Sequence, residues 1–219
     1  MTDPGGDLRD ELARLGADVV AAGLVVGSGG NLSVRAPGAD TCLVTSSGAW
    51  LDRLRHSDFV RVRIGDGAPV DPDSGVAASS EVALHLHTYR TRPDVNAVVH
   101  LHPQSVLLLD ALGERIRLTT TDHVYYVREV TRVGFHLPGS DDLARAAAAA
   151  VADGANCVVL AHHGCSVLGG TVDMAHKRVR NLEEAARLTY RALALGRADL
   201  PECPPEFAAR LRIDRDISI

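Results

Sequence analysis

The sequence predicts an α/β fold in which helices cover the faces of a mostly antiparallel sheet, and three observations support this. Amphipathic helical stretches alternate along the chain with short apolar runs typical of strands. Hydrophobic residues make up 46% and charged residues 23% of the 219 residues, as in ordinary globular proteins with a sizeable core. No linker or repeat divides the chain, so we expect residues 1–219 to form a single domain.

The N-terminal half is predicted to have a helix at each end and strands between. The first helix covers residues 8–23, because its apolar residues recur at i+3 and i+4 spacing, and the glycine-rich segment 27–31 follows it. The second covers residues 82–91, after Ser79-Ser80-Glu81 and before Pro93. The strands are expected at residues 32–35, 42–45 and 59–64.

The C-terminal half begins with an apolar strand, residues 97–102, which Pro103 stops. Alternation of apolar and polar residues predicts a further strand over residues 126–133. After Gly196 the chain is rich in proline, and we expect a short final element or a partner-facing tail there. The remaining elements are helices at residues 104–112, 141–152 and 173–195 and strands at residues 157–161 and 165–168.

Composition excludes several classes of function. The net charge of −5 offers no basic surface for a nucleic acid, and no apolar stretch reaches the roughly 20 residues that span a membrane. Residues 1–7 lack the basic start and apolar middle of a signal peptide. The four cysteines have no Cys-x-x-Cys spacing, which favours a reduced, cytoplasmic protein. From the charge and the lack of a long apolar stretch we expect neither nucleic-acid nor membrane partners.

Two histidine pairs at the ends of apolar runs are the strongest chemical signal. In His100-Leu101-His102, alternation along a strand places both imidazoles on one face. A second pair, His162-His163, ends the run 157–160. Core histidines bonded to the backbone are the alternative, but paired histidines on two buried strands favour a three-histidine site for a divalent metal. The other histidines, including His85 on the helix after Glu81, are given no such role.

Glu81 opens the helix 82–91 and has two interpretations. It is either a charge favoured by the helix dipole or a general base beside the metal. Free backbone N–H groups at a helix start, with the hydroxyls of Ser79 and Ser80, also suit a phosphate group. The segment 27–31 and the turn Ser46-Ser47-Gly48 could add further donors.

Five ordered motifs resemble one family. They are Gly30-Asn31-Leu32-Ser33, Thr45-Ser46-Ser47-Gly48, Ser79-Ser80-Glu81, His100-Leu101-His102-Pro103 and His163-Gly164. Residues 8–196 thereby resemble a class II aldolase of the fuculose-phosphate aldolase type, in the family that includes ribulose-phosphate 4-epimerases and the adducin head domain. The resemblance implies a three-layer α/β/α sandwich and a homotetramer with active sites at subunit contacts.

The resemblance also implies the site residues. His100, His102 and His163 would bind Zn²⁺ or another divalent ion such as Mn²⁺, and Glu81 would be the acid/base group, touching the metal when no substrate is bound. A second proton donor is expected within the segment 119–126. Its candidates are Asp122, His123, Tyr125 and Tyr126. The phosphate of a sugar phosphate would lie against Ser28, Gly30, Asn31, Ser47, Gly48, Ser79 and Ser80.

The implied reaction is zinc-dependent cleavage of a ketose 1-phosphate resembling L-fuculose 1-phosphate. Its products are dihydroxyacetone phosphate and an aldehyde, formed through a metal-stabilised enediolate. Lys177 is the only lysine, which argues against Schiff-base chemistry. The alternatives are an epimerase, a dehydratase or a decarboxylase on the same metal site, and a non-catalytic adducin-like binding module.

Overall fold

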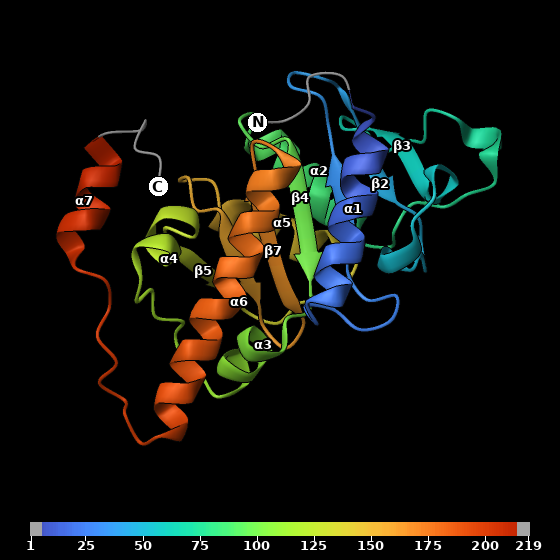
Figure 1. Cartoon of the computed structure of the whole chain (residues 1–219). Helices are drawn as coiled ribbons and strands as arrows, with labels where there is room; N and C mark the ends of the chain where they lie inside the picture. Colours follow the sequence, from blue (N-terminus) through green and yellow to red (C-terminus); the bar gives the residue numbers. More distant parts are fainter. Residues whose placement is uncertain (1–5, 214–219) are drawn as a thin grey trace.

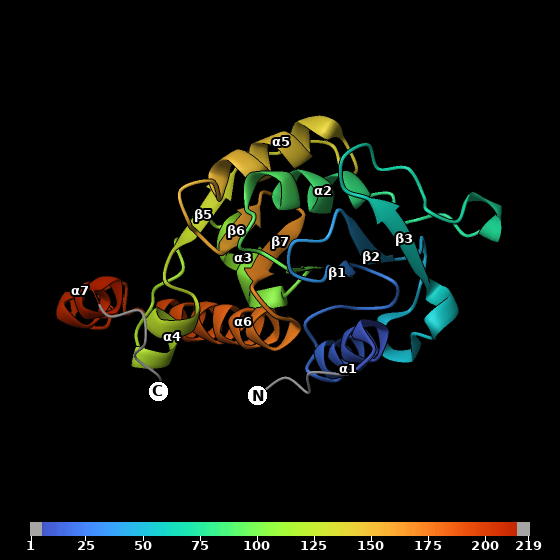
Figure 2. The same cartoon turned by 90° about the horizontal axis from the view of Figure 1, so that it is seen from above.

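The computed structural model describes residues 6–213, which form a seven-stranded sheet between two layers of helices (Figures 1 and 2). The strand order is β3-β2-β1-β4-β7-β6-β5. Within the described residues only β5 and β6 pair in parallel, so the prediction of a mostly antiparallel sheet is confirmed. The strands are β1 (Asn31–Val34), β2 (Thr41–Thr45), β3 (Phe59–Arg63), β4 (Ala97–Leu101), β5 (Val130–Val133), β6 (Cys157–Leu160) and β7 (Gly164–Gly169).

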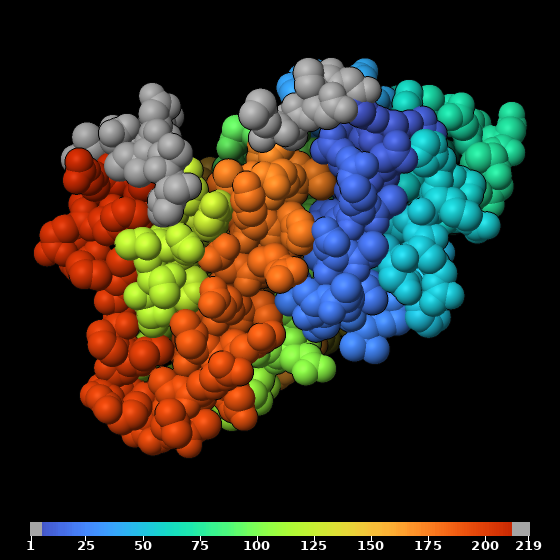
Figure 3. All heavy atoms as spheres, viewed as in Figure 1, coloured from blue at the N-terminus to red at the C-terminus, as the bar shows by residue number. Residues whose placement is uncertain are grey.

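Seen from above, the helices divide between the two faces of the sheet (Figure 2). One face carries α2 (Val82–Thr91) and α5 (Asp141–Ala150), which pack on each other. The other carries α1 (Leu8–Ala21), α3 (Gln104–Ala111), α4 (Thr121–Tyr126) and α6 (Val172–Ala194). Figure 3 shows α1 and α6 side by side over this face. The last helix, α7 (Pro205–Ile213), lies at the margin beside α4, and short 3₁₀ turns at Leu51–Arg53, His56–Asp58 and Pro72–Ser74 complete the chain.

Strand β4, near the middle of the sheet, shows how the two cores arise. Its five residues are all buried, and alternate side chains point to opposite faces. Val99 packs in the core beneath α1, α3 and α6, whereas Val98 packs in the core beneath α2 and α5. His100, two residues after Val98, therefore lies on the face of α2, where Glu81 begins that helix.

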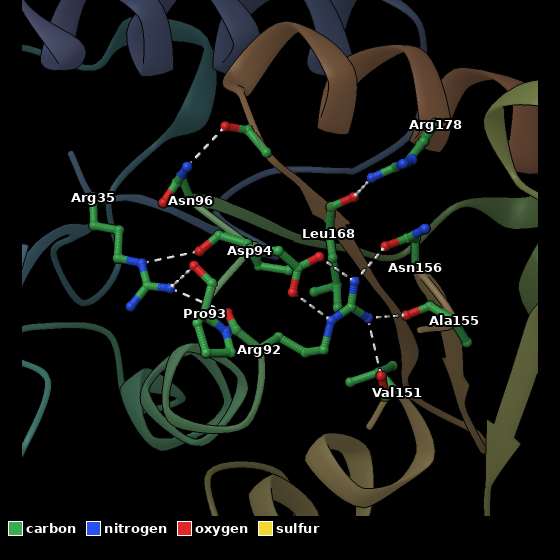
Figure 4. A network of polar contacts seen from close by, with 12 residues as sticks. Arg35, Arg92, Pro93, Asp94, Asn96, Val151, Ala155, Asn156, Leu168 and Arg178 are labelled. Atoms are coloured by element: carbon green, nitrogen blue, oxygen red, sulfur yellow. Dashed lines mark hydrogen bonds and ion pairs between the residues drawn. The ribbon is translucent and has the colours of Figure 1, made fainter. Parts of the chain in front are cut away.

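Two buried arginines fix the N-terminal end of β4 (Figure 4). Arg35, directly after β1, donates to the carbonyl oxygens of Val95 at 2.9 Å and Pro93 at 2.9 Å. Arg92, which ends α2, donates to Ala155 O at 2.8 Å and also to Val151 O, Asn156 Oδ1 and Asp94. Arg35 thus provides donors for backbone carbonyls between α2 and β4, and Arg92 does so for those between α5 and β6.

The strand expected over residues 126–133 is wrong in its first half. Residues 121–126 form α4, because Thr120 caps that helix by accepting from the His123 backbone N–H at 3.1 Å. Arg128 then adopts a left-handed φ of 62°, so the chain turns before it enters β5 at Val130. The segment contains the end of a helix, a turn and then a strand. A pattern of alternating polarity over so few residues cannot distinguish this arrangement from one continuous strand.

The other predicted elements are present, with bounds within three residues of those expected. The predicted domain 1–219 includes residues 1–5 and 214–219, which lie outside the described residues. Across residues 6–213, no helix combines the length and apolar character required to cross a membrane.

Candidate active site

Three histidines meet where β4 ends. His100 is in β4, His102 follows it, and His163 lies in the turn between β6 and β7. Antiparallel pairing of Leu101 with Cys165 brings the end of β4 beside that turn. One ring nitrogen from each histidine lies within 4.8 Å of the other two, so the cluster could hold a metal ion.

Glycines on both sides make this close approach possible. Gly30 has a left-handed φ of 73°, and a Cβ there would lie 2.5 Å from the carbonyl oxygen of His100. A Cβ on Gly164 would overlap the Leu101 carbonyl and lie 2.6 Å from Cδ2 of His102. The glycines of the two motifs Gly30-Asn31 and His163-Gly164 are therefore required by packing against the histidine strand.

The ring nitrogens of the three histidines converge on one point. His100 donates from Nδ1 to Cys165 O at 3.0 Å, which leaves its Nε2 facing Nε2 of His102 at 3.1 Å. Burial and the neighbouring His100 lower the pKa of His102 to about 4, which favours a neutral ring. Neutral imidazoles with a carboxylate alongside are the donor set that Zn²⁺ prefers, so the residues fit a divalent metal.

Glu81 adjoins the same nitrogens. Its Oε2 lies 3.0 Å from His100 Nε2 and its Oε1 lies 3.2 Å from His163 Nε2. Burial raises the pKa of Glu81, but the hydrogen bond and charge of His100, the charge of His163 and the amide of Asn31 outweigh it, giving a value of about 2. A positive charge within the cluster, whether a proton on one of the rings or a bound cation, thus keeps the carboxylate ionised. Oε1 has no hydrogen-bond partner among residues 6–213, nor has Nδ1 of His163.

A chain of buried hydrogen bonds runs from Glu81 into the core beneath α2. Asn31 Nδ2 donates to Glu81 Oε2 at 3.0 Å, and its Oδ1 lies 2.5 Å from His85 Nε2. His85 Nδ1 lies 2.6 Å from Ser33 Oγ, which in turn lies 2.7 Å from the Tyr89 hydroxyl. Because Asn31 donates to the carboxylate, its oxygen must accept from His85, so each donor in the chain points toward Glu81.

Sequence reasoning missed the contribution of His85. The available signal was its position one helical turn after Glu81, which places both side chains on one face of α2. Burial lowers the pKa of His85 to about 3, so the ring stays neutral with one donor and one acceptor nitrogen. Asn31, assigned from sequence to the phosphate, has its amide committed to Glu81 and His85.

The predicted phosphate loops lie partly together. The Ser47 N–H donates to Ala77 O and the Ser79 N–H donates to Thr45 O, each at 3.0 Å, so the turn 45–48 adjoins the start of α2. An open pocket of about 540 Å³ is lined by Ser46, Ser47 and Gly48. Ser80 is exposed and Ser79 buried, while Ser28 is exposed in the loop whose Gly29 approaches Nδ1 of His102.

Across residues 6–213, the four candidates for a second proton donor do not contact the histidine cluster. His123 is buried, with its Nε2 3.2 Å from Glu184 Oε2 on α6. Tyr125 and Tyr126 contact each other at a centroid distance of 4.9 Å, and Asp122 is exposed. Within the described part of the chain, no hydrogen bond, ion pair or ring contact joins these four to the histidine cluster or Glu81.

Residues 10–190 match the sequence profile of the Class II Aldolase and Adducin N-terminal domain. The chain belongs to this family. Among its relatives is an L-fuculose phosphate aldolase of Methanocaldococcus jannaschii, 33% identical over 168 residues that cover 75% of this chain and 86% of the relative. Another is a 3-oxo-tetronate 4-phosphate decarboxylase of Escherichia coli, 33% identical over 188 residues that cover 84% of this chain and 86% of the relative.

Solved structures of the class II aldolase family have the same fold. An L-fuculose 1-phosphate aldolase superposes with a TM-score of 0.83 at 28% identity, covering 95% of this chain and 97% of its own. YgbL of Klebsiella pneumoniae, described as a candidate aldolase, epimerase or decarboxylase, superposes with a TM-score of 0.82 at 32% identity, covering 94% and 97%. The expectation of a class II aldolase sandwich is therefore confirmed, and the relatives' reactions divide between aldol cleavage and decarboxylation.

Proposed function

We propose that this class II aldolase family member cleaves a ketose 1-phosphate resembling L-fuculose 1-phosphate into dihydroxyacetone phosphate and an aldehyde. The observation that carries the proposal is the position of the Glu81 carboxylate, whose oxygens lie 3.0 Å from His100 Nε2 and 3.2 Å from His163 Nε2. That arrangement pairs a proton acceptor with a place for a cation, which are the two requirements for negative charge to form beside a carbonyl.

His100, His102 and His163 would hold Zn²⁺, or another divalent ion such as Mn²⁺, and Glu81 would be a further ligand when no substrate is bound. The bound ion supplies Lewis-acid stabilisation of the negative charge that develops on the carbonyl side of the breaking bond. His100 is oriented for this role by its Nδ1 bond to Cys165 O, which leaves Nε2 as its only free donor of a lone pair.

Glu81 would move the proton at carbon. As an ionised base it accepts a proton from the carbon next to the carbonyl of dihydroxyacetone phosphate in the condensation direction, and it returns that proton in the cleavage direction. Asn31, held by His85, fixes Oε2, so Oε1 is the oxygen left for proton transfer.

The substrate phosphate would lie against the start of α2 and the two loops beside it. Free N–H groups and the positive end of the helix dipole favour an anion there. Ser47 and Gly48 approach this helix start through the backbone bonds between residues 45–47 and 77–79. The proposed contacts are Ser28, Gly30, Ser47, Gly48, Ser79 and Ser80. The side-chain amide of Asn31 is bonded to Glu81 and His85, so Asn31 would support this site without contacting the phosphate through that amide.

Protonation of the departing aldehyde oxygen needs a second acid. Because Asp122, His123, Tyr125 and Tyr126 have no contact with the histidine cluster within the described chain, we propose that one of them acts in the active site of a second copy in a homotetramer. The four cysteines are all free, which supports a reducing, cytoplasmic setting.

Decarboxylation of a 3-oxo acid phosphate is a second candidate. The match to the Escherichia coli decarboxylase extends over 188 residues, against 168 for the archaeal aldolase. Loss of carbon dioxide also leaves negative charge beside a carbonyl, yet it requires no acid for a departing aldehyde. It would therefore need no residue besides the cluster and Glu81.

A substrate panel separates the two candidates. Purified protein loaded with Zn²⁺ or Mn²⁺ is incubated with ketose 1-phosphates and with 3-oxo acid phosphates. Release of dihydroxyacetone phosphate with an aldehyde supports the aldolase, and release of carbon dioxide supports the decarboxylase. Absence of turnover on the whole panel, with no bound metal in the purified protein, would contradict both and favour a binding module.

A further inference from the structure

The turn that carries His163 contains an unusual backbone conformation. His162 has a φ of 56°, in the left-handed region that residues other than glycine rarely adopt. The next residue, His163, closes the turn by donating from its N–H to Leu160 O at 3.0 Å. The direction in which the His163 side chain leaves the turn therefore depends on what holds His162 in this conformation.

Asp110 provides that contact from the last turn of α3. The backbone N–H of His162 donates to Asp110 Oδ2 at 2.8 Å, and Nε of Arg132 on β5 donates to Oδ1 at 2.6 Å. The Asp110 side chain is 1% exposed, so the carboxylate is buried between these donors. Burial raises the pKa of Asp110, but the bonds from His162 and Arg132 outweigh it and lower the pKa, which keeps the group ionised.

Helix α3 is also anchored at its other end, next to His102. The backbone N–H groups of Ser105 and Val106 donate to the carboxylate of Glu183 on α6, at 3.1 Å and 3.2 Å. Pro103 and Gln104 are the only residues between His102 and that anchored turn. One short helix, fixed at its start by Glu183, thus connects the segment of His102 with the turn of His163.

We propose that Asp110 is a positioning residue for His163, holding the β6–β7 turn so that its imidazole meets those of His100 and His102. The inference rests on the proposed metal site. Asp110 touches neither a metal ligand's side chain nor the substrate loops, and its effect passes through the backbone of His162. Neither the mechanism nor the sequence motifs assign it a role.

The test measures metal affinity rather than turnover. Asp110→Asn keeps the shape of the side chain but replaces one acceptor oxygen with a donor, so one of its two bonds is lost. We expect Zn²⁺ affinity, measured by competition with a chromogenic chelator, to fall by roughly 10–100-fold. The absorption spectrum of the Co²⁺-loaded variant should also change, because the ligand geometry changes with His163.

Asp94→Asn is the matched control. Asp94 is the carboxylate partner of Arg92 at the opposite end of β4, and its loss should leave Zn²⁺ affinity and the Co²⁺ spectrum as in the wild type. Equal Zn²⁺ affinity in wild type and Asp110→Asn, with fast hydrogen exchange at the His162 amide of the variant showing that its bond to residue 110 is lost, would overturn the inference alone. A wild-type protein that binds no Zn²⁺ would overturn the proposed function together with it.

Hydrogen exchange on the unaltered protein gives a test that does not depend on whether a variant folds. The His162 side chain is exposed, yet its backbone N–H is bonded to a buried carboxylate. We expect slow exchange at this amide. Fast exchange, at the rate of an unbonded surface amide, would contradict the proposal.

Discussion

The two ends of strand β4 differ in how completely their buried polar groups are paired. At the start of the strand, the guanidinium groups of Arg35 and Arg92 donate to carbonyl oxygens and to Asp94 with every nitrogen (Figure 4). At its end, the imidazoles lie close to one another, and Glu81 Oε1 and His163 Nδ1 have no hydrogen-bond partner within the described residues. At the start of the strand only Asn96 Oδ1 lacks a partner within residues 6–213, and such nearly complete pairing suits a structural role. Unpaired acceptors beside the three histidines suit a ligand.

The energetic consequences of disturbing the two ends should differ accordingly. Removing an arginine donor from the start of the strand leaves buried carbonyls unpaired, at about 1–3 kcal/mol for each group. Removing a histidine from the other end takes away one ligand of the proposed cation. The first change should lower the free energy of unfolding and leave metal binding and turnover intact. The second should abolish metal binding and turnover with little effect on stability.

His102→Ala should have the largest effect on chemistry. It removes one of three proposed ligands, so we expect metal affinity and turnover to be lost together, with little change in the melting temperature of the metal-free protein. Elemental analysis of the purified variant and the substrate panel check this. His176→Ala, a half-buried histidine away from the cluster, is the control. Wild-type metal stoichiometry in His102→Ala would remove this residue from the ligand set.

Glu81→Gln should retain metal binding but lose most of the catalytic activity. The amide keeps the size of the side chain but cannot accept the proton, so we expect kcat to fall by about 10²–10⁴-fold. Metal should remain bound through the three histidines, as measured by elemental analysis. Turnover at the wild-type rate would exclude Glu81 as the base.

Arg92→Met should act at the opposite end of the strand. It leaves the carbonyl oxygens of Val151 and Ala155 without their donor, so we expect the free energy of unfolding to fall by about 3 kcal/mol. Chemical denaturation measures the loss, and Arg63→Met, an exposed arginine paired with Asp66, is the control. Zn²⁺ affinity should be unchanged. If affinity fell as much as in His102→Ala, the two ends would not be independent.

His85→Phe should have the smallest effect on chemistry. It removes the donor that orients Asn31, so Glu81 loses its fixed position while the metal ligands stay intact. We expect kcat to fall by about tenfold with KM and metal affinity nearly unchanged, as for other residues behind a site. His87→Phe, two positions along α2 and bonded to Asp141, controls for a change on the same helix. Equal kcat values for the two variants would show that Asn31 holds Glu81 without help.

Local patterns predicted the parts of the site that lie on single segments. The i, i+2 spacing of His100 and His102 and the position of Glu81 at a helix start were visible in the chain itself. His85 and Asp110 were not, because their roles arise from pairing across the fold. His85 matters only since β1 runs beside β4 and places Asn31 opposite His100. Asp110 matters only since α3 returns toward the β6–β7 turn.

The pairing of β4 with β7 has a further consequence for how the protein folds. It joins His100 and His102 to His163, which lies 61 positions after His102, so the cluster exists only after strands distant in the sequence have met. An unfolded chain offers an ion no comparable site, and any ion held by the folded cluster stabilises that state by mass action. The melting temperature should then rise with the concentration of free metal. The fraction of protein that is folded at a given temperature would therefore depend on how much metal is available.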